Sequence, residues 1–510
     1  MSNSADILSS SIRKSHLLPL ALAGLKLLVH LPVLARYGFH HDELYFIACG
    51  AHPAFGYVDH PPLVPWIARL STSLFGDSLL GLRLFPLLAG AAAIFLLAVL
   101  VRRLGGGMFA QLTAGLAYLI APVYLRSQNM LCIPAFEPLF WTLGAYFLVR
   151  IIQEDNPRLW LWLGAVTGVG LLNKHSMLFF GFGLVVALAL TPLRRHFKSP
   201  WLYLGGVMAG LIFLPNLIWQ AANDWATVGF LMNLNEGVMS GISVLQFVAG
   251  QVLYLNPINA ILWIWGLVFF FTRPGREYRA LGWMWVAVFV LLVITRSKIY
   301  YLAPAYPMLL AGGAVALTRW VERCRRSWLR PVTTGVLILA GAVLAPLSLP
   351  ILDIDTTEQY IHRMTFGAFE NVYELTRDLR GMFGWRERVA AVAAVYRGLP
   401  PGEQATAVIW APGYGNAGAV DLFGPAYGLP RATCLSMSYW LWGLPEQDPL
   451  TPVIGVGWDK ETMEKLFDQV EVARVIRLEH AAPGGADFPV TICRQPKYDL
   501  RELWPKNRPW

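Results

Sequence analysis

The amino-acid sequence predicts a mainly α-helical polytopic membrane protein of about eleven transmembrane helices, with a small extracytoplasmic α/β domain at its C-terminal end. Hydrophobic residues make up 56% of the 510 residues and charged residues only 14%, whereas a soluble protein carries about 25% charged residues. The apolar residues gather in runs long enough to cross a hydrocarbon core of about 30 Å. Beyond residue 350 these runs stop, and residues 351–510 mix charges with glycine- and proline-containing turns.

Eleven apolar runs are candidate membrane-spanning helices. The fifth is short for a span, and the eighth is long enough to contain a break at Asn256 and Pro257. The runs are 16–35, 79–101, 108–125, 131–152, 159–172, 177–191, 201–219, 244–272, 280–295, 301–320 and 332–350. The sequence therefore predicts a membrane module over residues 1–350.

Basic residues in the short connections indicate the orientation, because lysine and arginine are retained on the cytoplasmic side of a membrane. They concentrate in every second connection, for example at Arg102 and Arg103 or at Arg194 and Arg195. With a cytoplasmic N-terminus, the first loop (36–78) and everything after residue 350 lie on the extracytoplasmic face of the plasma (inner) membrane. The net charge of +9 arises beside the spans rather than on one soluble face, so nucleic acid is not an expected partner.

Residues 351–510 show the patterns of a soluble domain. Residues 386–396 have apolar side chains at helical spacing, and 460–469 is a second candidate helix. Residues 405–410 and 472–478 are short apolar stretches typical of strands. Strands that alternate with helices predict a small α/β domain.

The first loop is rich in acids and histidines. Asp42 and Glu43 follow the first apolar run, and Asp59 and His60 stand before a pair of prolines. Charged groups beside a bilayer cost free energy unless they are solvated, paired with an opposite charge or part of a functional site. A carboxylate in a partly dry pocket can act as a general base or bind a divalent cation. Adjacent carboxylates point in different directions, so one of Asp42 and Glu43 can face a substrate; a solvated helix end capped by Asp42 is the alternative.

A second group of polar residues lies near the predicted outer membrane surface. Lys298 and Tyr301 belong to the stretch RSKIYYLAPAYP, and Lys174 lies on the same predicted face. Cations and phenols there can bind a lipid phosphate through charge-assisted hydrogen bonds, or they can simply anchor the helices at the interface. In the C-terminal part, an acid and three aromatic residues are candidates for sugar contact by stacking, or for the core. These residues are Asp421, Tyr439, Trp440 and Trp442.

The order of these motifs resembles that of the polytopic glycosyltransferases of the protein O-mannosyltransferase and aminoarabinose-transferase type, a family 39-like group with the GT-C fold. The resemblance covers roughly residues 10–350. It rests on the Asp42–Glu43 pair after the first helix, an acid–base–Pro–Pro element, a lysine at the fifth-helix exit, and K-x-Y-Y-L-x-P-x-Y-P beginning at Lys298. It implies a GT-C-like helical bundle and a donor sugar carried on a polyprenyl phosphate.

The resemblance also implies roles for the residues. An inverting glycosyltransferase would move the sugar to an extracytoplasmic acceptor, with Asp42 as catalytic base and Glu43 beside it. A glycolipid or glycan acceptor is favoured over a protein, because no β-trefoil domain of the protein mannosyltransferase kind is visible. Asp59 and His60, which stand where the family has Glu-Lys, are a possible site for a divalent metal. The expected donor-phosphate ligands are His60, Lys174, Lys298 and Tyr301, and the expected acceptor contacts are Asp421, Tyr439, Trp440 and Trp442.

Two other classes of membrane protein remain possible from the sequence. A transporter (flippase) of lipid-linked sugars would also be polytopic, but would show inverted repeats and ionisable residues at mid-membrane, whereas the acids here lie at the predicted rim. A non-catalytic scaffold that presents the C-terminal domain has no need of the acid–histidine loop.

Overall fold

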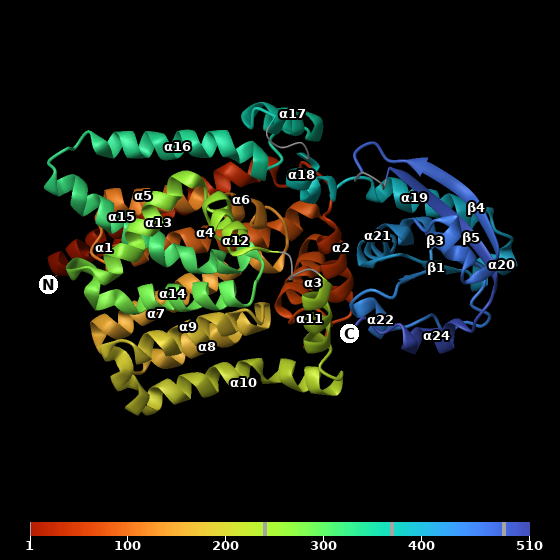
Figure 1. The fold of residues 1–510 in the computed structure, drawn as a ribbon, viewed down its shortest axis with the longest axis horizontal. Coiled ribbons are helices and arrows are strands. Elements are labelled where there is room, and N and C mark those ends of the chain that lie inside the picture. Colours follow the sequence, from red (N-terminus) through yellow and green to blue (C-terminus); the bar gives the residue numbers. More distant parts are fainter. Residues whose placement is uncertain (1, 238–241, 368–371, 482–485) are drawn as a thin grey trace. The chain divides into compact units, whose positions relative to one another are not determined.

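The computed structural model describes residues 2–237, 242–367, 372–481 and 486–510 (Figure 1). The chain divides into two compact units, which are described separately. The first unit consists of Met1–Leu34, Arg83–Trp219 and Leu234–Ile351, and the second of Ala35–Leu82, Gln220–Asn233 and Leu352–Trp510. The first loop, which we expected within the membrane module, therefore shares a compact unit with the C-terminal part of the chain.

The first unit is a bundle of helices, and all eleven predicted apolar runs are helical in it. Its α-helices are α1 (Ser2–His30), α4 (Leu79–Arg103), α5 (Met108–Leu119), α6 (Pro122–Ser127), α7 (Glu137–Glu154), α8 (Leu159–Asn173), α9 (Met177–Ala189), α10 (Pro200–Ala222), α12 (Val244–Tyr254), α13 (Pro257–Phe271), α14 (Arg279–Ile294), α15 (Tyr306–Arg323) and α16 (Leu329–Ser348). Short 3-10 turns join several of them, among them η3 (Pro192–Lys198) and η6 (Ile299–Ala305).

The number of spans is lower than the eleven expected. Within the described residues, seven helices are long and apolar enough to cross a membrane, and nine if each of two sharply bent pairs counts as one span. The difference arises at α5 and α8, which have 12 and 15 residues where a span needs about 20. The fold class is confirmed: this is a multi-pass membrane protein.

The predicted break in the eighth run is present. Helices α12 and α13 meet at an angle of 104°. Asn256 lies between them with φ of 79°, and its side-chain oxygen accepts a hydrogen bond from the backbone N–H of Ile258 at 3.1 Å. Pro257 begins α13, where its missing N–H costs nothing. The Asn-Pro pair thus ends one helix and caps the next.

Close helix packing in the first unit depends on glycine. Gly266 of α13 and Gly313 of α15 face each other's helix, and a Cβ atom on either would collide with a backbone carbonyl, that of Leu309 or that of Leu262. Small residues at such crossings let membrane helices approach closely and gain van der Waals contact.

The second unit combines helices from both ends of the chain with a small sheet. Its helices are α2 (His41–Ala51), α3 (Leu63–Phe75), most of α11 (Ala226–Gly237), α17 (Ile354–Met364), α18 (Val372–Arg380), α19 (Trp385–Gly398), α20 (Pro401–Thr406), α21 (Tyr414–Phe423), α22 (Ser438–Trp442), α23 (Lys460–Glu464) and α24 (Leu500–Lys506). Its strands are β1 (Val408–Trp410), β2 (Ala432–Thr433), β3 (Val453–Val456), β4 (Phe467–Arg477) and β5 (Asp487–Pro496).

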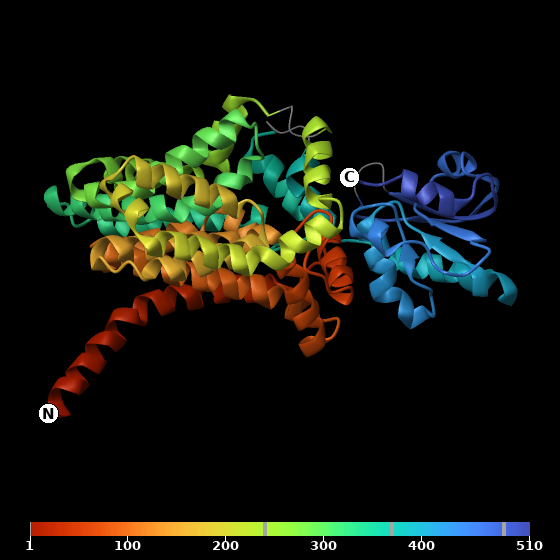
Figure 2. The same cartoon turned by 90° about the horizontal axis from the view of Figure 1, so that it is seen from below.

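The sheet has the strand order β2-β1-β3-β5-β4. Strands β2, β1 and β3 are parallel, whereas β5 runs antiparallel to both β3 and β4. Helices α19 and α24 lie on opposite sides of the sheet (Figures 1 and 2). The α/β character predicted for residues 351–510 is therefore confirmed. The helix predicted at 460–469 ends earlier, at Glu464, because Phe467 is fully buried as the first residue of β4.

Candidate active site

The second unit contains the acids and histidines of the first loop, and its helix α2 begins among them. The loop predicted there is in fact largely helical. His40 is the N-cap of α2: its Nδ1 accepts a hydrogen bond from the N–H of Asp42 at 3.3 Å, and its own N–H donates to the Glu43 carboxylate at 2.8 Å. This reciprocal arrangement is a capping box. Glu43 is fully buried, so the structure gives it a capping contact, and of the two predicted acids Asp42 is the accessible one.

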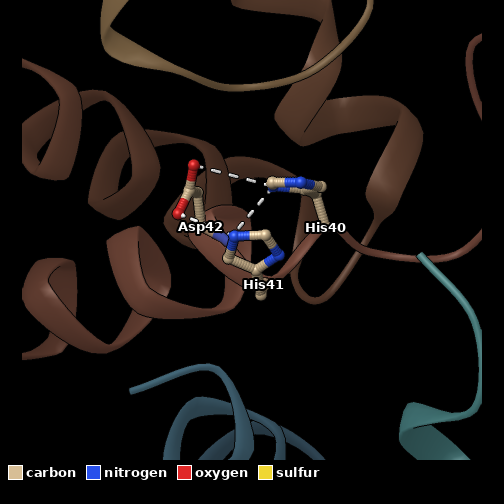
Figure 3. A group of neighbouring side chains, drawn as sticks. All are labelled: His40, His41 and Asp42. Atoms are coloured by element: carbon tan, nitrogen blue, oxygen red, sulfur yellow. Dashed lines mark hydrogen bonds and ion pairs between the residues drawn. The ribbon is translucent and has the colours of Figure 1, made fainter. Parts of the chain in front are cut away.

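Asp42 lies at the N-terminus of α2, where the helix dipole favours a negative charge. Its side chain is 35% exposed, and Oδ1 accepts a hydrogen bond from the hydroxyl of Tyr414 at 2.9 Å. His41 Nε2 lies 3.4 Å from Oδ1, and His40 Nδ1 lies 3.7 Å from Oδ2 (Figure 3). Burial, and then the neighbouring His41, lower the pKa of His40 to about 4. His40 is therefore neutral at pH 7 and does not form an ion pair with Asp42.

A second carboxylate, Asp59, is held beside this helix. The hydroxyl of Tyr45 donates to Asp59 Oδ1 at 2.7 Å and accepts a hydrogen bond from the N–H of Ser438 at 3.1 Å. Ser438 Oγ also accepts a hydrogen bond from the N–H of Val58 at 3.1 Å. A serine from the C-terminal part of the chain thus fixes the backbone next to Asp59 and the phenol that binds it.

His60 is fully buried among aromatic rings, 5.1 Å from that of Phe46 and 5.0 Å from that of Tyr57 between centroids. Its Nδ1 lies 2.9 Å from the carbonyl oxygen of Pro61, so Nδ1 carries the proton and donates it. The lone pair is then on Nε2, 3.8 Å from Asp59 Oδ1, and in the described part of the chain this atom has no hydrogen-bond partner.

Two groups of residues in this unit have the side-chain types that bind a divalent metal, and they differ in which histidine nitrogens are free to bind it. In His40, His41 and Asp42 the ligand atoms lie within 4.8 Å of one another. However, the lone pair of His40 Nδ1 is already used to cap α2, and a neutral imidazole has only one free lone pair. In the Asp59–His60 pair, by contrast, Nδ1–H is bound to a carbonyl and Nε2 is free, which is the arrangement of metal-binding histidines. Of the two groups, the predicted pair leaves a histidine nitrogen free for a metal, and metal binding by Asp59 and His60 stays a prediction.

In the first unit, Lys174, one of the expected phosphate ligands, is surrounded by an acid, a hydroxyl and two tyrosine rings. Lys174, just after α8, donates to the carboxylate of Glu137 at 2.8 Å, and the hydroxyl of Ser176 donates to the other carboxylate oxygen. The Lys174 ammonium also lies 4.4 Å from the ring centre of Tyr301 and 5.1 Å from that of Tyr300. Glu137 is buried, whereas the Lys174 side chain is 16% exposed. Of the predicted phosphate ligands, the structure thus places Lys174 against Tyr301.

Lys298 is the N-cap residue of η6, three residues before Tyr301. Its backbone carbonyl accepts a hydrogen bond from the N–H of Tyr301 at 3.1 Å. The side chain is half-buried, and among the residues that the structure describes no ion-pair or hydrogen-bond partner of its ammonium is found. The role of Lys298 in binding a phosphate stays a prediction.

The residues predicted to contact an acceptor are mostly engaged within the second unit. The Asp421 carboxylate accepts hydrogen bonds from the Tyr439 hydroxyl at 2.7 Å and from the N–H of Ala432 at 2.8 Å, and Tyr439 is buried. Trp440 exchanges indole-to-carbonyl hydrogen bonds with Trp504. These contacts give the three predicted residues structural partners.

Trp442 is half-buried, as are Asp421 and Trp440. It stacks on His52 with ring centroids 4.3 Å apart, and the guanidinium of Arg431 lies 5.3 Å from its ring centre. Contact of Trp442 with an acceptor stays a prediction.

Sequence reasoning missed three residues that shape these groups. Glu137 was visible as an acid inside an apolar run, which is a signal of function or pairing in membrane helices, but its partner Lys174 is 37 residues away. Tyr414 and Ser438 carried no such signal. Their partners Asp42 and Tyr45 lie 372 and 393 residues away in the sequence.

Part of this chain is similar to known membrane glycosyltransferases. Residues 59–219 match the family model described as dolichyl-phosphate-mannose-protein mannosyltransferase. The lipid A galacturonosyltransferase RgtD of Rhizobium johnstonii is 26% identical over 262 residues, which is 50% of this chain and 54% of that protein. A polyprenol-phosphate-mannose–protein mannosyltransferase of Corynebacterium glutamicum is 32% identical over 109 residues, which is 21% of each chain.

An undecaprenyl phosphate-α-4-amino-4-deoxy-L-arabinose arabinosyl transferase of Pseudomonas fluorescens is 27% identical over 216 residues, 41% of this chain and 38% of that protein. The chain thus matches about half the length of these relatives or less. Among solved structures, ArnT from Cupriavidus metallidurans bound to undecaprenyl phosphate has a TM-score of 0.62 at 17% identity, over 92% of this chain and 97% of that one, which is a likeness of fold. These comparisons confirm the resemblance found in the sequence: residues 59–219 match the mannosyltransferase family model, and the fold is similar to that of ArnT.

Proposed function

We propose that this protein is an inverting glycosyltransferase that moves a sugar from a polyprenyl-phosphate carrier to a glycolipid acceptor of the lipid A type. The observation that carries the proposal is Asp42: an accessible carboxylate, held on one oxygen by a phenol and not paired with a lysine or arginine among the described residues. An accessible carboxylate that is fixed in position can reach the proton of a bound hydroxyl, and this geometry is the first requirement of a general base.

In the proposed reaction, the acceptor hydroxyl attacks the anomeric carbon of the donor sugar. The new C–O bond forms as the bond from that carbon to the phosphate oxygen breaks, and the polyprenyl phosphate leaves with the bonding electrons. Asp42 takes the proton of the hydroxyl. Attack from the face opposite the leaving phosphate inverts the anomeric configuration.

The phosphate-binding group proposed for the first unit consists of Lys174, Lys298 and Tyr301. Glu137 binds Lys174 at 2.8 Å and so fixes the ammonium in one position, which lowers the reorganisation that phosphate binding requires. Cations aimed at a departing phosphate stabilise the charge that develops as the bond breaks, and this is usually the largest single contribution to catalysis. The net charge of the Lys174–Glu137 pair is zero, so we assign the excess positive charge to Lys298.

For the second unit we propose Asp59 and His60 as the residues that hold a divalent metal. A metal ion held there would supply Lewis-acid chemistry. The protein's own contribution is to fix the ligands: Tyr45 orients the Asp59 carboxylate, and the Pro61 carbonyl holds the imidazole of His60 with Nε2 unprotonated.

For the location, we propose the bacterial inner membrane with a cytoplasmic N-terminus. The alternation of basic connections along the spans supports this orientation. It places residues 36–78 and residues 351–510 on the extracytoplasmic side, where a lipid A-type acceptor is available. The named acceptor of the relative RgtD, lipid A, supports a glycolipid over a protein, and the mannosyltransferase relative makes a protein acceptor an arm of the test.

The test is transfer by the purified protein in detergent. Radiolabelled polyprenyl-phosphate sugars are incubated with lipid A or with a protein acceptor, and the products are separated. We expect label on lipid A, and we expect Asp42→Asn to lower the rate by about 10²–10⁴-fold, the usual contribution of a general base. Asp459→Asn is the matched control, because Asp459 also lies at a helix N-terminus of the same unit, as the N-cap of α23, where asparagine caps equally well.

Two results would contradict the proposal. If Asp42→Asn transfers sugar as fast as Asp459→Asn, Asp42 is not the base. If labelled donor crosses the bilayer of proteoliposomes while no acceptor becomes labelled, the protein is a transporter.

A further inference from the structure

Asp42, the accessible acid of the first loop, is held by a residue from the C-terminal part of the chain. Tyr414, the first residue of α21, donates its hydroxyl hydrogen to Asp42 Oδ1 at 2.9 Å. Its ring also lies 4.8 Å from that of Tyr45, the phenol bound to Asp59. Burial, followed by the charge of Asp42, raises the pKa of Tyr414, so the phenol remains a hydrogen-bond donor at neutral pH.

The position of Tyr414 is fixed by a close helix contact. Helix α21 packs on α2 through two glycines: a Cβ on Gly418 would lie 2.8 Å from the carbonyl oxygen of Leu44, and a Cβ on Gly415 would lie 2.8 Å from the Cβ of His41. Both distances are shorter than real Cβ contacts. The two backbones therefore touch at these points, and the residue that precedes Gly415 is brought against the N-terminus of α2.

The two oxygens of Asp42 are in different situations. Oδ1 accepts the Tyr414 hydrogen bond. Oδ2 lies 3.7 Å from Nδ1 of His40, and this nitrogen accepts the N–H of Asp42 and has no proton to donate. Within the described residues, Oδ2 therefore accepts no hydrogen bond and is the oxygen available for a substrate proton.

We propose that Tyr414 is a positioning residue for the reaction: it holds Asp42 Oδ1 so that Oδ2 faces the acceptor hydroxyl. The inference rests on the proposed function of Asp42 as base and extends it to the C-terminal part of the chain, which then completes the active site instead of only covering it. Ser438 acts in the same sense on Asp59, through Tyr45 and the N–H of Val58.

The charged and titratable groups around Asp42 are few. On its own helix His40 is neutral and His41 is partly exposed, with Nε2 3.4 Å from Oδ1. From α21 the facing group is Tyr414, and from α18 Asp378 acts electrostatically on His40. The phenol hydrogen bond at Oδ1 is therefore the main described contact that fixes the orientation of the Asp42 carboxylate.

The test compares Tyr414→Phe with Tyr396→Phe. Tyr396 is the matched control, because its hydroxyl also makes one hydrogen bond in the same unit, to the carbonyl of Gln404 at 3.0 Å, but does not contact the first loop. We expect Tyr414→Phe to lower kcat about 10- to 100-fold, the effect of a misplaced reacting group, with KM for the donor unchanged. Equal kcat values for the two variants, or a change in KM without a change in kcat, would overturn the proposal.

A second measurement does not depend on turnover. Hydrophobic carbodiimides react with carboxyl groups, so the labelling rate of the Asp42 peptide at one fixed pH, measured by mass spectrometry, reports how accessible this carboxyl group is. We expect faster labelling in Tyr414→Phe than in wild type and Tyr396→Phe, because the hydrogen bond to Oδ1 is lost, and equal rates would refute the role of Tyr414. If the rate changes but wild-type protein labels no acceptor in the transfer assay, the positioning contact stands and the proposed function fails.

Discussion

Gly418 is the position where a single added methyl group should separate α21 from α2. The Cβ of alanine at this position would lie 2.8 Å from the carbonyl oxygen of Leu44, where ordinary contact begins at 3.4 Å. The obstacle is backbone, not a flexible side chain, so one helix must retreat by about 0.6 Å to restore contact. The helix that can move is α21, since α2 is also fixed by its capping box and by packing on α3.

The added methyl group should lower both the stability of the second unit and the rate of sugar transfer. Overpacking of this kind costs about 1–3 kcal/mol, which for a unit of this size corresponds to a fall in Tm of about 2–12 °C. A retreat of about 0.6 Å would also stretch the Tyr414–Asp42 hydrogen bond from 2.9 Å to about 3.5 Å, close to the limit at which such a bond is lost. Transfer should therefore fall in parallel with Tyr414→Phe, although Tyr414 itself is unchanged.

The assay is thermal unfolding of the purified protein, followed by tryptophan fluorescence, together with sugar transfer at a temperature well below both Tm values. Gly398→Ala is the matched control, because a Cβ there meets nothing within 4 Å. If Gly418→Ala unfolds and transfers like Gly398→Ala, then α21 does not rest on α2 at this glycine, and the argument for a fixed Tyr414 is refuted.

The remaining predictions concern two buried groups. Lys174→Met leaves the buried carboxylate of Glu137 without its cation and should lower the free energy of unfolding by about 3–5 kcal/mol. In the double variant with Glu137→Gln, most of this stability should return while sugar transfer stays low. A double variant as unstable as Lys174→Met would show that the two residues are not coupled. Burial lowers the pKa of His40 to about 4 in the folded protein, whereas the pKa is about 6.5 in an unfolded chain. The neutral imidazole therefore contributes stability that is present above pH 6.5 and is lost as the pH falls toward 4. His40→Asn keeps an N-cap residue but does not titrate, so urea unfolding should give a flatter stability profile between pH 6.5 and 4, and a profile as steep as that of wild type would contradict the assignment.

The membrane bundle was predictable because local amino-acid composition determines its helices. Each span is a run of apolar residues, and even the bend at Asn256–Pro257 has a local cause in proline and in the capping asparagine. The first loop was predictable only in its chemistry. Helix α2 is short, and its N-cap is a histidine, which does not belong to the serine, threonine, aspartate and asparagine group that usually signals a helix start. The loop was therefore expected without its helices.

The partners of the site residues could not be predicted. The choice between Asp42 and Glu43 is decided by the capping box, which buries Glu43, and this follows from the histidine N-cap that the pattern did not reveal. The hydrogen bond from Tyr414 depends on the packing of α21 on α2, which in turn depends on glycines that look like ordinary turn residues in the sequence. Pairings over such distances along the chain are properties of the tertiary fold and leave no trace in periodicity or spacing.

The contact of α21 with α2 has a consequence for biogenesis. Asp42 and Tyr414 are separated by 372 residues, and a ribosome adds roughly 5–20 residues per second, so α2 exists for roughly 20 to 75 seconds before its partner helix has been synthesised. During this interval the nascent chain has already inserted most of its spans, while the surface of α2 that α21 will cover is unprotected. The proposed activity should therefore appear only after α21 has been synthesised, so a shorter nascent chain that already holds Asp42 should be inactive.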